Sequence, residues 1–150
     1  MQAAGKEEQM ERVAGEFRDA MQNRDLAALL HLFREDCEIE LFDLKLRGHD
    51  GVEKWFNWTF GHMKAMQFER LSSAVGGDIF YEEYLLSGVI HNGKKTQSRQ
   101  ARVLVFEGGR VKSFRLYMDR LQFADSVVND FAGRLIVKKF IEVSVKGMKP

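Results

Sequence analysis

Asp25-Leu-Ala-Ala-Leu-Leu-His-Leu-Phe33 opens the stretch that decides the fold, and Gly109-Arg-Val-Lys-Ser-Phe-Arg-Leu-Tyr117-Met-Asp119 closes it. Between these two segments the sequence predicts a capped helix and several strands separated by glycine-containing turns. Helices followed by a run of strands are typical of an α+β domain. The pattern therefore indicates where a ligand would lie, against a sheet covered by helices, better than which ligand it is.

Three helices are expected in the first half of the chain. From Glu7 to about Gln22 the apolar residues recur at the spacing of one buried helical stripe, and they are Met10, Val13, Ala14, Phe17 and Met21. Asp25 is a suitable N-cap for the second helix. Asp50 is the expected N-cap of the third, from about Gly51 to Met63.

The third helix carries more aromatic surface than one buried stripe needs. Trp55, Trp58 and His62 form one row, and a second row runs from Val52 through Phe56. A helix that is apolar on two sides is either sandwiched between other elements or forms the wall of a cavity.

Strand-like alternation dominates the rest of the central stretch. Turn residues separate the expected strands, most clearly at Gly76-Gly77-Asp78 and at the Asn-Gly pair of residues 92–93. The expected strands are Cys37–Leu46, Phe68–Val75, Ile79–Ile90, Gln97–Phe106 and Arg110–Asp119.

The C-terminal extension, about residues 125–150, has its own pattern. Phe123 to Leu135 is compatible with a helix. Phe140 to Lys146 alternates apolar and polar residues, which predicts a strand that needs a sheet edge, and we expect it to extend a contact between two copies of the chain.

Composition limits the function classes. The formal net charge of +1 over 150 residues predicts no nucleic-acid partner. Cys37 is the only cysteine, so no intramolecular disulfide can form, and neither a leader peptide nor a membrane span is apparent. We expect a cytoplasmic protein without membrane contact. The four histidines lack metal-ligand spacing, and no phosphate loop or dinucleotide fingerprint is present, which predicts neither metal nor cofactor.

Several segments together resemble the nuclear transport factor 2-like superfamily, and within it the SnoaL-like group. They are Asp25–Asp36, Gly48–Phe56, Gly77–Tyr81, Leu86–Gly88, Phe106–Val111 and Tyr117–Asp119. The resemblance implies one domain over residues 1–150 with its core at about 7–124. It implies a cone-shaped, curved antiparallel sheet with the three helices on its concave face, and a homodimer.

The resemblance also allows the family's chemistries to be compared with this chain. The three functional positions of the ketosteroid isomerases correspond to Leu41, Phe17 and Arg102, so that mechanism is not expected. The aspartate of the limonene-type epoxide hydrolases corresponds to Leu116. The acid/base aspartate of the SnoaL polyketide cyclases corresponds to Asp119, which matches.

Two of these residues have alternative interpretations. Asp119 is either a general acid/base, or a structural residue that pairs with Arg115 or Arg120 or caps a helix beginning near Leu121. Strand alternation places Arg102 on the face that the resemblance assigns to the pocket. It either orients an anionic group there, or is an inward arginine neutralised by Glu82, Glu83 or Asp119.

The predicted function is binding of a small apolar or aromatic molecule with a polar or anionic group, with acid/base turnover left open. Asp119 would transfer the proton and Arg102 would orient the ligand. The walls would be Trp55, Trp58, Tyr84, Phe17, Leu41 and Leu116. The alternative is a non-catalytic dimeric assembly module with a vestigial pocket.

Overall fold

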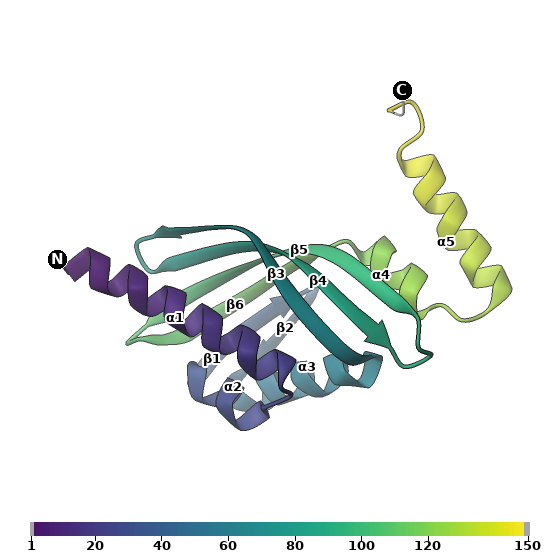
Figure 1. The fold of residues 1–150 in the computed structure, drawn as a ribbon. Helices are drawn as coiled ribbons and strands as arrows, with labels where there is room; N and C mark the ends of the chain where they lie inside the picture. The colour runs from purple at the N-terminus through teal and green to yellow at the C-terminus, as the bar shows by residue number, and fades with distance from the viewer. Residues whose placement is uncertain (1, 149–150) are drawn as a thin grey trace. The chain divides into compact units, whose positions relative to one another are not determined.

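A computed structural model describes the backbone of residues 2–148 and the side chains of residues 3–124 and 128–148. The chain divides into two compact units, residues 1–118 and 119–150. The first unit contains three helices and a six-stranded sheet, and the second contains two helices (Figure 1). Among the described residues, no helix combines the length and the apolar character needed to cross a bilayer.

The first unit begins with the helices α1 (Gln2–Gln22) and α2 (Leu26–Leu32), followed by the strands β1 (Phe33–Leu41) and β2 (Leu44–Arg47). After α3 (Gly48–His62) come the long strands β3 (Met63–Gly76), β4 (Ile79–Ile90), β5 (Lys95–Glu107) and β6 (Arg110–Met118). The sheet order is β2-β1-β6-β5-β4-β3, and all pairs are antiparallel except β1–β6.

The sheet is curved and unclosed, and α1, α2 and α3 lie on one side of it (Figure 1). Register shifts in β1, in β3 and between β5 and β6 add bends to the strands. This arrangement confirms the predicted α+β fold with helices on the concave face.

The core lies between the helices and the concave face. The predicted α1 stripe is buried from Met10 to Met21. Cys37 is buried and free, on the same face of β1 as Ile39 and Leu41, as the alternation of that segment predicted.

Two local predictions in the first half were wrong. The expected single strand Cys37–Leu46 is a hairpin, because the chain reverses at Phe42, whose φ of 55° lies in the left-handed region. The expected cap Asp50 lies inside the first turn of α3, which begins at Gly48 after an N-cap, Arg47, that makes no side-chain capping bond. Gly51 instead permits close approach to β2, since a Cβ there would lie 2.9 Å from the Cβ of Leu46.

The cap at Asp25 was predicted correctly and gives a direct test. Its carboxylate accepts a hydrogen bond from the backbone N–H of Ala28 at 2.9 Å. We expect Asp25→Ala to lower the free energy of unfolding by about 1 kcal/mol, because the Ala28 N–H in the first turn of α2 loses its acceptor. Asp50→Ala is the matched control, with an expected loss of about 0.3 kcal/mol from the helix dipole alone. Urea denaturation measures both, and equal losses would contradict the assignment of the two caps.

The second unit corrects the prediction for the C-terminal extension. It contains α4 (Arg120–Val127) and α5 (Phe131–Ser144), so the expected strand Phe140–Lys146 is largely helical. Asp130 caps α5 by accepting a hydrogen bond from Gly133 N–H at 2.6 Å. The helical spacing of the apolar residues Ile136, Val137, Phe140 and Ile141, together with this cap, outweighs the two-residue alternation at the end of α5.

Candidate functional site

The sheet register brings most of the predicted pocket residues from the strands onto one face. Leu41 pairs with Leu116, Leu116 pairs with Arg102, and Arg102 pairs with Glu82, so four neighbouring strands contribute one row of side chains. A second row, closer to the end of β6, contains Tyr84 and Gln100. Arg102 also contacts α1, which confirms that this face is the helix-covered one.

Phe17 on α1 lies at the centre of an aromatic cluster against these rows. Its ring centroid is 5.4 Å from that of Phe114 and 5.9 Å from that of Trp55. The guanidinium of Arg102 lies 4.3 Å from the Phe17 ring centroid and 5.6 Å from that of Tyr84. The predicted residues Phe17, Trp55, Tyr84 and Arg102 are therefore contiguous.

A groove of about 280 Å³ lies between α3 and the β1–β2 hairpin. Three predicted wall residues, Leu41, Trp55 and Trp58, line it together. Phe42, Leu44, Leu46 and Lys54 complete its lining. The surface is almost entirely apolar, with the Lys54 side chain as its one charged member, so it suits the body of a flat apolar molecule.

Arg102 and Glu82 form a buried ion pair in the same cross-strand row as the groove residue Leu41. The exposed fraction of Arg102 is 1% and that of Glu82 is 2%. Glu82 Oε2 accepts from Arg102 Nε at 2.7 Å and lies 2.5 Å from Nη2, while Nη2 also donates to the Ala14 carbonyl at 3.1 Å. Glu82 thus neutralises Arg102, which is one of the two interpretations of Arg102 that the sequence allowed.

Glu82 has two further arginine partners. Its Oε1 accepts from Arg18 on α1 and, at 2.8 Å, from Nε of Arg70 on β3. Arg70 also donates to Glu11 on α1 at 2.7 Å. Three arginines thus face two carboxylates, and the network ties α1 to three strands.

The electrostatics of the network keep Glu82 ionised. Burial acts to raise the pKa of Glu82, but the charge of Arg102, the hydrogen bond from Arg70 and the charge of Arg18 leave it below its ordinary value. Burial raises the pKa of Tyr84, so its hydroxyl stays protonated and donates to Gln100 Oε1 at 3.0 Å. Glu82 therefore keeps its charge and Tyr84 keeps its proton near pH 7. These two groups act as a fixed charge and a hydrogen-bond donor, not as acid/base groups.

Asp119 is placed at the start of the second unit. It is the N-cap of α4, and its exposed carboxylate accepts from the Leu121 backbone N–H at 2.8 Å. This contact agrees with the capping alternative in the sequence interpretation.

The capping role of Asp119 has a measurable signature. Asparagine caps a helix as well as aspartate does, whereas alanine does not. We expect Asp119→Asn to change the free energy of local unfolding of α4 by no more than about 0.3 kcal/mol relative to the unmodified protein. Asp119→Ala should lower it by about 1 kcal/mol. Amide hydrogen exchange in the first turn of α4 measures both, and a large loss in Asp119→Asn would show that the charge itself is needed.

Several contributing residues were not predicted from sequence. Arg18, Arg70 and Glu11 are partners of the buried pair, and Lys54 lies in the groove. The only available signal was that Arg18 follows the buried Phe17 on α1, which does not reveal a partner 64 positions away. No cluster of three or more histidine, cysteine or carboxylate side chains suited to a metal occurs in residues 3–124 and 128–148.

The chain belongs to the SnoaL-like domain family, which it matches over residues 14–114. Solved structures with the same fold include an NTF2-like protein of unknown function from Burkholderia pseudomallei. It shares 19% identity, with a TM-score of 0.75, and the match covers 81% of this chain and 98% of that one.

Two further similar structures are known, one by an enzyme name and one by a co-crystallised compound. An LEH-like epoxide hydrolase from M. tuberculosis is 19% identical over 89% of this chain and 94% of its own, with a TM-score of 0.64. TerC, co-crystallised with polyporic acid, is 12% identical over 75% of this chain and 92% of its own, with a TM-score of 0.68. At these identities the likeness establishes the fold alone. A search of curated proteins found no match.

Proposed function

We propose that the first unit binds a small apolar or aromatic molecule that carries a polar or anionic group. The observation that carries this proposal is the apolar groove of about 280 Å³ lined by Leu41, Trp55 and Trp58. Its wall residue Leu41 belongs to the same cross-strand row as Arg102, so an apolar surface and a charged group lie on one face. The apolar body of the ligand would occupy the groove. Its polar group would point along the cross-strand row from Leu41 toward Arg102.

Acid/base turnover is a further part of this proposal, with Asp119 as the proton-transfer residue. The position of Asp119 directly after β6, which the resemblance to the polyketide cyclases picks out, supports it. Asp119→Asn is the suitable variant, because asparagine preserves the cap while removing the proton acceptor. Ligand binding that survives together with complete loss of conversion would assign the proton transfer to Asp119.

Native mass spectrometry of the freshly purified protein tests the binding. We expect a reproducible added mass of small-molecule size that is lost in Trp58→Ala. Tyr81→Ala is the matched control, since Tyr81 is an exposed aromatic residue elsewhere on the sheet. Absence of any added mass, together with no thermal stabilisation by a panel of two-ring aromatic compounds, would contradict the proposal.

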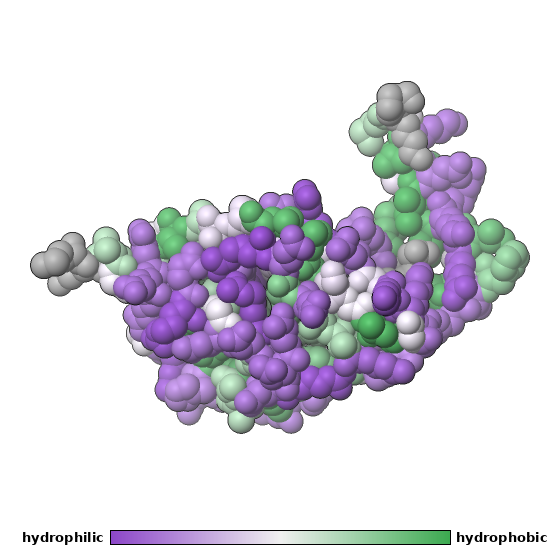
Figure 2. All heavy atoms as spheres, in the orientation of Figure 1, coloured by the Kyte–Doolittle hydropathy of each residue, from purple (hydrophilic) through white to green (hydrophobic). Residues whose placement is uncertain are grey.

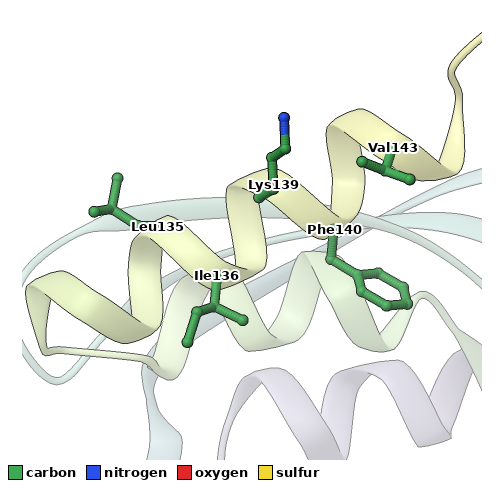
Figure 3. A pocket seen from close by; sticks show the side chains of 5 residues that line it. All are labelled: Leu135, Ile136, Lys139, Phe140 and Val143. Carbon is green, nitrogen blue, oxygen red and sulfur yellow. The ribbon is translucent and has the colours of Figure 1, made fainter.

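A second candidate function is a cytoplasmic, homodimeric assembly module. The observation that favours it is an exposed apolar face on α5, formed by Leu135, Ile136, Phe140 and Val143. The Lys139 side chain lies along the same stretch of α5 and lines this surface together with them (Figure 3). Hydrophobic residues lie along α5 beside hydrophilic ones on the molecular surface (Figure 2).

The partner in this second candidate is another copy of the chain. Phe140→Lys, and deletion of residues 137–150, should then convert a dimer into a monomer in size-exclusion chromatography with light scattering, without loss of ligand binding. Lys138→Ala on the polar side of the helix is the control. If both variants keep the molecular mass of the dimer, α5 does not form the dimer contact.

A further inference from the structure

The guanidinium of Arg102 is buried with one of its nitrogens unsatisfied. Nη1 has no hydrogen-bond partner within the part of the chain that the structure describes, whereas Nε and Nη2 are both used. An unpaired buried donor is costly, and the cost is higher for a charged group. Nη1 therefore marks a position where an acceptor is missing.

The direction of the missing acceptor follows from the planar shape of the guanidinium. Nε and Nη2 point to Glu82 on β4, so Nη1 lies on the far edge of the plane. The next residue of the row on that side is the partly buried Leu116, followed by Leu41 in the groove wall. Two strand spacings, roughly 10 Å, separate Arg102 from Leu41, which is within reach of a two-ring molecule with one substituent.

The charge of the missing group follows from the network. Arg18, Arg70 and Arg102 supply three positive charges, and Glu82 and Glu11 supply two negative ones. The excess is one positive charge (3 − 2 = 1). Within this network Arg102 and Glu82 are buried, whereas Arg18, Arg70 and Glu11 are partly exposed to solvent. One negative charge would balance it, whereas a neutral group would not and a dianion would exceed it.

We propose that Nη1 of Arg102 anchors a planar, singly charged oxyanion of the carboxylate type on the ligand that occupies the groove. The inference rests on the proposed function, because the groove holds the apolar body of the same ligand. The ligand class is thus an aromatic or alicyclic monocarboxylate, or an enolate of the same charge and shape. Leu116 lies between the two parts of the site and must move aside for the anion to reach Nη1.

A matched pair of probes tests the proposal by isothermal titration calorimetry at pH 7. 2-Naphthoate carries the anion and 2-naphthamide is its neutral analogue of the same shape. In the unmodified protein we expect naphthoate to bind at least about tenfold more tightly than the amide, because the hydrogen bond is charge-assisted.

Three variants locate the source of this preference. Arg102→Met removes the donor, and Glu82 keeps Arg18 and Arg70 as partners. Leu116→Phe keeps every charge but fills the path to Nη1. Lys54→Gln removes the cation in the groove lining. We expect the naphthoate-to-naphthamide ratio to fall to about one in the first two and to persist in the third, with circular dichroism confirming that each variant is folded.

Each contrary result has a distinct meaning. Equal affinity for both probes in the unmodified protein, or a preference that is lost in Lys54→Gln and retained in Arg102→Met, would overturn the anion site and leave the proposed binding function standing. A water molecule bound to Nη1 would give this equal affinity. Failure of both probes and of larger aromatic acids to bind would overturn the proposed function and the anion site together.

Discussion

Glu82→Gln is expected to lower the free energy of unfolding by about 3–5 kcal/mol, the cost of removing one partner from a buried ion pair. The carboxylate accepts hydrogen bonds from Arg18, Arg70 and Arg102, and its side chain is completely buried. A neutral amide leaves the buried guanidinium of Arg102 without a counter-charge. Chemical denaturation followed by fluorescence of Trp55 and Trp58 measures the loss.

Glu83→Gln is the matched control for this substitution. Glu83 is the next residue of β4 and points to the other side of the sheet, where its carboxylate lies 3.5 Å from Arg99 and both side chains are substantially exposed. Exposed pairs contribute little, so the expected loss is below about 0.5 kcal/mol. Similar losses in the two variants would mean that the arginine network around Glu82 does not stabilise the fold.

The pH dependence of stability provides an independent check on Glu82. Because the pKa of Glu82 in the folded protein lies below its ordinary value of 4.5, the unfolded chain takes up the proton first as the pH falls. The stabilisation by Glu82 is therefore fully present above pH 4.5 and is lost as the pH falls through the folded pKa. The decrease in stability below pH 4.5 should be shallower in Glu82→Gln than in the unmodified protein.

The sequence predicted those parts of the fold where local pattern and packing agree. The α1 stripe around Phe17, the cap at Asp25 and the strand faces of β5 were all predicted from spacing. The hairpin at Phe42 was missed because nothing in the residue type requires the left-handed conformation that Phe42 adopts. At the end of α5, alternation over a few residues suggested a strand. The helical spacing of apolar residues extends further toward the N-terminus and decides the structure.

The candidate site was predictable only as far as strand alternation and the resemblance reach. Together they place Arg102, Leu116 and Leu41 on one face, and the observed register confirms that arrangement. The partners of Arg102 were only partly predictable. Glu82 is 20 positions away in sequence and Arg18 makes its contact with Glu82 over 64 positions, so these contacts depend on how α1 crosses the sheet.

Phe17→Ala is expected to destabilise the protein by about 3–5 kcal/mol, the usual cost of truncating a fully enclosed phenylalanine. Phe17 is 2% exposed, and its ring contacts Phe33, Phe114 and Trp55. Tyr117→Ala is the matched control, because Tyr117 is an aromatic residue of the same sheet that is 54% exposed. Its expected loss is below about 1 kcal/mol.

The same substitution should also change the candidate site, because the Phe17 ring covers the guanidinium of Arg102. Its removal opens a cavity between α1, Trp55 and Arg102, which lets water reach a charge that is otherwise dry. Water competes with a ligand anion for Nη1 and weakens the electrostatic contribution. Calorimetry on the folded variant should therefore show a smaller naphthoate preference, while naphthamide, which depends on the groove between α3 and β1–β2, should bind with nearly unchanged affinity. An unchanged naphthoate preference in a destabilised but folded variant would show that Phe17 supports the core without shielding Arg102.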